Sequence, residues 1–161
     1  MKKVAILFCL VFTTLISFGQ EAFPSVQLKS VSGKTVDFAK IAKSTSDTLL
    51  VVSFWATWCI PCINELDNIN DLYEEKQLIK PFKFLGVSID DSRTSQRVKP
   101  FVKGKGWNFD VLIDLNSDLK RALNITDVPQ VIIIKNNQIV YRHTGYIVGE
   151  ENNLFDEIQK L

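Results

Sequence analysis

Cysteine and histidine are scarce in this chain of 161 residues, which contains three cysteines and a single histidine. A structural zinc site needs four ligands, usually drawn from these two residue types. Cys9 lies in an N-terminal segment that we expect to be removed, which leaves Cys59, Cys62 and His143. The sequence therefore argues against a structural zinc site, and no metal is expected.

Neither sign of charge is in clear excess, since the chain contains 19 basic and 18 acidic residues. Binding to nucleic acid phosphates requires a basic surface, so this balance argues against a nucleic-acid partner. Hydrophobic residues make up 46% of the chain and charged residues 23%, which is typical of a globular protein. The length suits one domain with a substantial core and is short for two.

No apolar run is as long as a typical membrane-spanning helix, which needs about 20 residues. The mainly apolar run over 4–18 is shorter and follows two lysines. Ser17 and Gly19 are small residues with the spacing of a signal-peptide cleavage site after Gly19. We therefore predict a signal peptide over 1–19 and a domain over 20–161 that is exported to the periplasm or cell envelope. An uncleaved membrane anchor is the alternative.

Two cysteines separated by two residues stand where a predicted strand gives way to a predicted helix. The run 49–55 is nearly continuous in apolar residues, as in a strand covered on both faces, and helical spacing begins at Ile63. A helix N-terminus favours a thiolate through its free N–H groups and partial positive charge. Haem attachment would need a histidine where Ile63 stands. Redox exchange needs only Cys59 and Cys62.

The rest of the pattern alternates predicted strands with predicted helices. Gly33 marks a turn in an N-terminal hairpin whose second strand continues through Val36 and Phe38, and Asn136-Asn137 marks a second hairpin. Other strands are expected over 82–89, 111–113, 131–134 and 138–142, and other helices over 92–102 with an interruption near Pro100, after a Ser117 cap, and at the C-terminus. This order predicts an α/β fold with a mixed sheet and helices on both faces.

The segment Phe54-Trp55-Ala56-Thr57-Trp58-Cys59-Ile60-Pro61-Cys62 resembles the active-site signature of the thioredoxin superfamily. Val128-Pro129 before a strand is similar to its cis-proline element. The export signal, the N-terminal hairpin, Glu65 and an extra segment over 90–115 resemble the exported TlpA/ResA-like branch of thiol:disulfide oxidoreductases, which is linked to cytochrome c maturation. The resemblance implies a thioredoxin-like fold, with a mixed central sheet flanked by helices, an N-terminal β-hairpin and a central insertion.

The resemblance also implies a dithiol site that works without a cofactor. Cys59 is expected to attack as a thiolate, and Cys62, one helical turn later, to resolve the mixed disulfide. Trp58 is expected to offer a docking surface, and Val128 and Pro129 to hold an extended substrate strand. The expected partners are proteins with thiols or disulfides and a membrane-bound electron donor, and the chain is expected to act as a monomer.

One departure from thioredoxin concerns proton transfer. Thioredoxin carries a buried aspartate at the position of Ser53, and a serine cannot serve as a carboxylate base. Glu65 shares a helix face with Cys62, so it either takes over this role or is a first-turn glutamate favoured by the helix dipole. His143 has no partner motif, and we interpret it as a surface or packing residue.

Three functions are compatible with these patterns. The first is an exported thiol:disulfide oxidoreductase, expected to be a reductant because Ile60-Pro61 places no cation beside Cys59. The second is a peroxiredoxin-like thiol peroxidase, since peroxiredoxins share the hairpin and the insertion. Their peroxidatic cysteine, however, lies in a threonine-containing loop without a Trp-Cys-x-x-Cys signature. The third is a redox-inactive binding module or holdase on the same fold.

Overall fold

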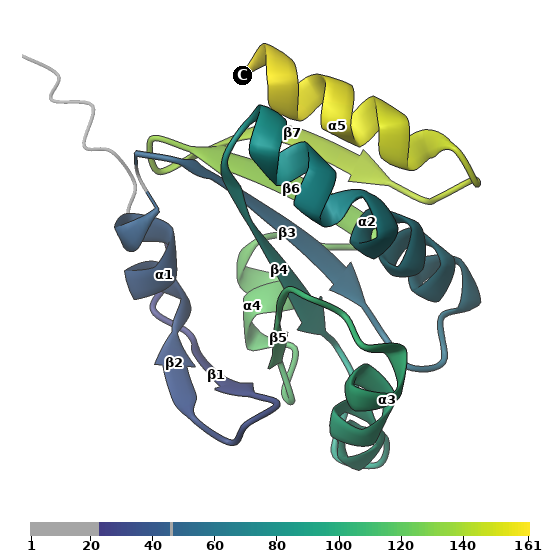
Figure 1. Ribbon diagram of the computed structural model, residues 1–161. Coiled ribbons are helices and arrows are strands. Elements are labelled where there is room, and N and C mark those ends of the chain that lie inside the picture. The colour runs from purple at the N-terminus through teal and green to yellow at the C-terminus, as the bar shows by residue number, and fades with distance from the viewer. Residues whose placement is uncertain (1–22, 46) are drawn as a thin grey trace, which may run out of the picture.

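A mixed sheet forms the centre of the computed structural model, which describes residues 23–45 and 47–161 (Figure 1). Its strand order is β2-β1-β5-β4-β3-β6-β7. The strands are β1 (Gln27–Ser30), β2 (Thr35–Asp37), β3 (Leu49–Trp55), β4 (Phe82–Ser88), β5 (Asp110–Ile113), β6 (Gln130–Lys135) and β7 (Gln138–Thr144). The helices are α1 (Phe38–Ser44), α2 (Ile60–Ile79), α3 (Val98–Lys105), α4 (Asp118–Ala122) and α5 (Glu150–Lys160), with a 3-10 turn η1 (Ser95–Arg97).

The predicted signal peptide, 1–19, lies outside the described residues. Across the ranges 23–45 and 47–161, no helix combines the length and the apolar character needed to cross a membrane.

The sheet is mixed and buried on both faces, as predicted. Strands β3, β4 and β5 run parallel to one another, whereas β6 pairs antiparallel with β3, and β7 with β6. Helices α2, α3 and α5 pack on one face, and α1 and α4 on the other. Every residue of the central strand β3 is buried, which explains its continuous apolar sequence. The predicted α/β thioredoxin-like architecture is confirmed.

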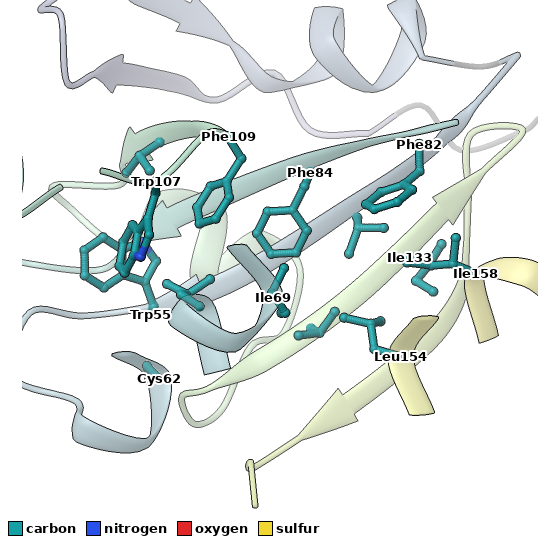
Figure 2. Packing of buried hydrophobic residues seen from close by; sticks show 14 of the residues in the cluster. Trp55, Cys62, Ile69, Phe82, Phe84, Trp107, Phe109, Ile133, Leu154 and Ile158 are labelled. Atoms are coloured by element: carbon teal, nitrogen blue, oxygen red, sulfur yellow. The ribbon is translucent and has the colours of Figure 1, made fainter. Parts of the chain in front are cut away.

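A row of aromatic rings fills the face beneath α2 (Figure 2). Ring centroids lie 5.0 Å apart for Trp55 and Trp107, 5.4 Å for Trp107 and Phe109, and 4.7 Å for Phe84 and Phe109. Such pairs each contribute roughly 0.5–1.5 kcal/mol beyond the burial of their area. Because Trp55 is the last residue of β3, this packing fixes the strand end from which the cysteine segment departs.

Both predicted hairpins are present. Gly33 adopts a φ of 88° in the turn between β1 and β2. Asn136 and Asn137 have φ angles of 50° and 61°, and two successive positive φ angles belong to the tight turn that matches the twist of paired strands.

The prediction that Phe38 continues the second strand is wrong, because Phe38 begins α1. Asp37 caps this helix, and its carboxylate accepts the N–H of Ala39 at 2.9 Å. Phe38 is fully buried and packs edge-on against Phe23, with ring centroids 5.8 Å apart. Burial of the ring therefore favours the helix over a longer strand.

Two predictions about helix boundaries also need correction. Helix α3 begins at Val98, so Pro100 stands in its first turn, where a missing N–H breaks no hydrogen bond, and it does not interrupt the helix. Ser117 precedes α4 but has a left-handed φ of 56°. The cap comes instead from Asp114, whose carboxylate accepts the N–H of Lys120 at 2.8 Å.

Candidate redox site

The cysteine pair lies at the connection between β3 and the start of α2, as the sequence pattern indicates. After Trp55 the chain turns, and Cys59 occupies the N-cap of α2 with extended backbone angles. Pro61 falls in the first helical turn, which tolerates a residue without an N–H group. The local sequence therefore sets both the start of the helix and the direction of the first cysteine.

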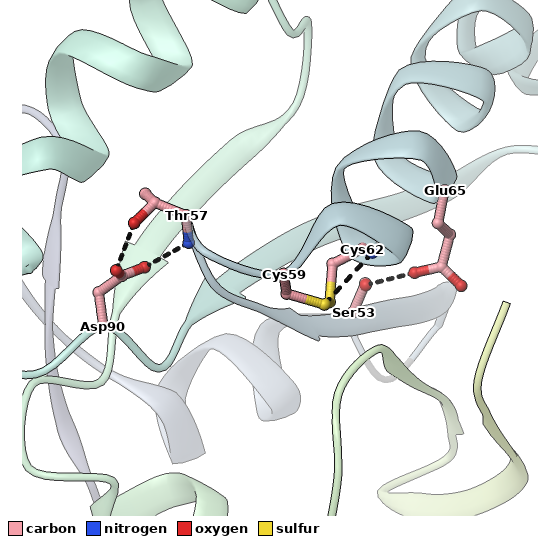
Figure 3. Close-up of a disulfide and its surroundings, with 6 residues drawn as sticks. All are labelled: Ser53, Thr57, Cys59, Cys62, Glu65 and Asp90. Atoms are coloured by element: carbon pink, nitrogen blue, oxygen red, sulfur yellow. Dashed lines mark hydrogen bonds between the residues drawn. A yellow bond between two sulfur atoms is a disulfide. The ribbon is translucent and has the colours of Figure 1, made fainter.

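Cys59 and Cys62 form a disulfide with a Cα–Cα distance of 5.3 Å (Figure 3). The backbone N–H of Cys62 donates to Sγ of Cys59 at 3.3 Å. Cys59 is 6% exposed, whereas Cys62 is fully buried. An N–H group directed at sulfur at a helix N-terminus stabilises a thiolate on Cys59 once the disulfide opens. A partner that approaches from solvent reaches Cys59 before Cys62.

Ser53 and Glu65 meet on one side of the disulfide (Figure 3). Oγ of Ser53 donates to Oε2 of Glu65 at 3.0 Å, and Glu65 is only 4% exposed. Burial raises the pKa of Glu65 to about 8, against the lowering effect of the Ser53 hydrogen bond and with a further increase from the charge of Glu150. A carboxyl with this pKa exchanges a proton near neutral pH, as a general base requires. Its role in proton transfer stays a prediction.

Asp90 lies on the other side and holds the segment that leads to Cys59 (Figure 3). Its buried carboxylate accepts the backbone N–H of Thr57 at 2.8 Å and the Thr57 hydroxyl at 2.6 Å. The Ser88 hydroxyl donates to it at 2.8 Å. Asp90 is a site residue that was not predicted from the sequence. The available signal was its place just after β4, because Ser88 pairs in parallel with Trp55 and the two strand ends therefore meet.

We expect Asp90→Asn to loosen the segment before Cys59. The asparagine keeps one acceptor oxygen but turns an amide donor toward the donors of Thr57 or Ser88, so a buried hydrogen bond is lost at a cost of about 1–3 kcal/mol. Urea unfolding should show this loss, and Cys59 should react more slowly with a small disulfide. Asp110→Asn is the matched control, because the Asp110 side chain is 71% exposed. Equal effects in the two variants would contradict the holding role of Asp90.

The remaining predicted site residues lie at the same end of the sheet. Gln130 pairs with Phe54, which places Val128 and Pro129 beyond the end of β3 from which the cysteine segment departs. The Val128–Pro129 peptide bond is cis, as the resemblance implied. Trp58 is 58% exposed, and Val128 is partly buried and packs against the core on both faces of the sheet. Their contribution to substrate binding stays a prediction.

Comparisons with known proteins agree with this geometry. The chain is 33% identical over 118 residues to thiol-disulfide oxidoreductase ResA of Oceanobacillus iheyensis, a match that covers 73% of this chain and 59% of that relative. It is 28% identical over 140 residues to ResA of Bacillus thuringiensis subsp. konkukian, a match that covers 84% of this chain and 75% of that relative. The solution structure of an uncharacterized thioredoxin-like protein from Porphyromonas gingivalis matches with a TM-score of 0.73 and 39% identity, covering 86% of this chain and 90% of that one. Residues 19–143 match the AhpC/TSA family, and the chain therefore belongs to this family within the thioredoxin superfamily.

Proposed function

We propose that this thioredoxin-like thiol:disulfide oxidoreductase reduces disulfides in exported proteins through Cys59 and Cys62. The observation that carries the proposal is the disulfide at the start of α2, with the Cys62 N–H directed at the sulfur of Cys59. The names of the ResA relatives support the reaction class. The similarity to the Porphyromonas gingivalis protein supports the thioredoxin-like setting.

The reaction consists of two sulfur exchanges. The Cys59 thiolate attacks one sulfur of a substrate disulfide, forms a mixed disulfide and releases the other sulfur as a thiolate. Cys62 then gives its proton to Glu65 and attacks Sγ of Cys59, which restores the intramolecular disulfide and releases the second substrate sulfur. Two electrons pass from the protein dithiol to the substrate. Glu65 receives the proton because it follows Cys62 by one helical turn.

The proposal includes export, a membrane-bound electron donor and a role in cytochrome c maturation. Export is supported by the pattern of residues 1–19, and the cytochrome link by the resemblance to the TlpA/ResA-like branch. Because Ile60-Pro61 adds no cation beside Cys59, we expect a reduction potential nearer the roughly −270 mV of thioredoxin than the roughly −120 mV of a strong oxidant. The donor must then return two electrons after each cycle.

Trapping of mixed disulfides tests the proposal. In Cys62→Ser the second exchange is blocked, so we expect substrate proteins to stay linked to Cys59 in the exported fraction and to be released by dithiothreitol. The double variant Cys59→Ser/Cys62→Ser is the control and should capture none. Apocytochrome c among the captured proteins supports the maturation role, whereas a broad set of secreted proteins favours general disulfide reduction.

Two outcomes would favour the other functions. Rapid consumption of hydrogen peroxide by the reduced wild-type protein would point to a thiol peroxidase. A protein-binding or anti-aggregation activity that survives in Cys59→Ser/Cys62→Ser, without any trapped partner in Cys62→Ser, would point to a redox-inactive binding module.

A further inference from the structure

A small cavity connects the surroundings of Glu65 with β7 and α5. Its volume is about 100 Å³, which has room for a few water molecules. Its lining is rich in groups that bind protons: Glu65, Tyr141, His143, Tyr146, Glu150 and Glu151. Glu65 comes from α2, while the other groups come from β7, the following loop and the start of α5. The cavity therefore gathers six titratable side chains around one space that extends from Glu65 to this edge of the sheet.

The strand register places His143 on the same face as the hydrogen bond that holds Glu65. Ser53 on β3 pairs with Val131 on β6, and Val131 pairs with His143 on β7. Directly paired residues on neighbouring strands point to the same side of a sheet, about 5 Å apart. Ser53, Val131 and His143 thus form one row beneath α2 and α5, with His143 at the outer end.

The imidazole of His143 reaches both the interior and the solvent. Its side chain is 40% exposed, yet its Nε2 is buried and has no hydrogen-bond partner within residues 23–45 and 47–161. Nε2 lies 3.6 Å from Oε2 of Glu150, beyond hydrogen-bond distance but close enough for attraction when the ring is protonated. A buried polar atom without a partner is rare in proteins and requires an explanation.

We propose that His143 relays protons between solvent and Glu65 through this cavity, with Glu150 as the charge that orients the imidazole. The inference rests on the proposed function. In each cycle Glu65 takes the proton of Cys62 as the S–H bond breaks and an O–H bond forms. The proton then passes through water in the cavity to Nε2 of His143, and the other ring nitrogen releases a proton to solvent. No electrons move in these steps.

The neighbouring groups are less suited to this task. Burial and the charges of Glu157, Glu150 and Glu65 raise the pKa of Tyr141, and burial with the Glu151 hydrogen bond raises that of Tyr146, so both tyrosines stay protonated at neutral pH. Glu150 accepts the N–H of Ile147 at 2.8 Å, and Glu151 accepts the Tyr146 hydroxyl at 2.6 Å. A neutral imidazole accepts a proton on one nitrogen and releases one from the other.

The relay is needed most below the pKa of Glu65. That pKa is about 8, so at neutral pH most Glu65 carboxyls hold a proton and must release it before they can take one from Cys62. At higher pH the carboxyl is already ionised when the cycle begins. The contribution of His143 should therefore fade as the pH rises through the pKa of Glu65.

Stopped-flow reaction of the reduced protein with dithiobisnitrobenzoate tests the relay, because each exchange releases one coloured thiolate. The first phase reports attack by Cys59 and the second reports attack by Cys62. In His143→Gln we expect an unchanged first phase and a second phase about tenfold slower near pH 7, a smaller effect than the roughly 10²–10⁴-fold of a direct general base because cavity water still carries protons. Above about pH 9 the variant should match the wild type. Imidazole added to His143→Ala should restore the second phase.

Val140→Ala is the matched control, since Val140 is an exposed residue of the same edge strand. A His143→Gln second phase that equals the wild type near pH 7, or that is slowed equally at every pH, would overturn the relay. Release of two thiolates by the wild-type protein would support the proposed function, whichever result His143→Gln gives. A wild-type protein that releases only one would refute the dithiol mechanism itself.

Discussion

Cys59→Ser should abolish the reduction of protein disulfides, with insulin reduction by dithiothreitol falling to the rate of dithiothreitol alone. Cys59 is the partly accessible sulfur at the N-cap of α2, whereas Cys62 is fully buried behind it. Loss of Cys59 therefore removes the only sulfur of the pair that an incoming disulfide reaches. Cys62→Ser should behave differently, because Cys59 can still make one attack before the cycle stops.

Counting released thiolates separates the two cysteines. With dithiobisnitrobenzoate, we expect two rapid equivalents from the reduced wild type, one from Cys62→Ser and none from Cys59→Ser. Circular dichroism should show that both variants are folded, since a serine replaces sulfur at nearly the same volume. One rapid equivalent from Cys59→Ser and none from Cys62→Ser would reverse the assigned roles.

Glu65→Gln should make the protein more stable at neutral and alkaline pH. The pKa of Glu65 is about 8 in the folded chain, against 4.5 as its ordinary value. Between these values the folded state binds more protons than the unfolded state, so the free energy of unfolding falls as the pH rises. The contribution of the raised Glu65 pKa to the free energy of unfolding is fully present below about pH 4.5. Its loss by pH 7 is on the order of 3 kcal/mol.

Urea unfolding of the oxidised protein at about pH 5, 7 and 9 measures this effect. Glutamine has the shape of glutamate and can still accept the Ser53 hydrogen bond, but it does not titrate. The advantage of Glu65→Gln over the wild type should therefore grow with pH. Glu75→Gln is the control on the same helix, because the Glu75 side chain is 65% exposed. Parallel pH profiles for the wild type and Glu65→Gln would show that Glu65 does not titrate with the raised pKa.

Features encoded by neighbouring residues could be predicted from the sequence. The apolar run of β3 and the Asn136-Asn137 turn follow local rules of burial and backbone conformation, and both are present in the structure. The cysteine pair at a helix start is a local signal of the same kind. These signals and the family resemblance were together sufficient to predict the mixed sheet and the position of the disulfide.

Features that depend on distant residues were missed. Asp90 lies 33 residues from Thr57 along the chain, and only the parallel pairing of β3 with β4 brings them together. His143 lies in one row with Ser53 because β3 pairs with β6 and β6 pairs with β7, both antiparallel. The second pairing has an irregular register at Ile133/Ile134, which a sequence pattern does not reveal. For α1 the Asp37 cap was visible, but the alternation of apolar residues favoured a strand.

The contacts of Asp90 have a consequence for the two redox states. They hold Thr57 through nitrogen and oxygen atoms alone, so opening of the Cys59–Cys62 bond breaks none of them. The hydrogen bonds that hold the backbone ahead of Cys59 therefore do not depend on the bond between the two sulfurs. Sulfur exchange at Cys59 can then proceed without release of the segment that presents it.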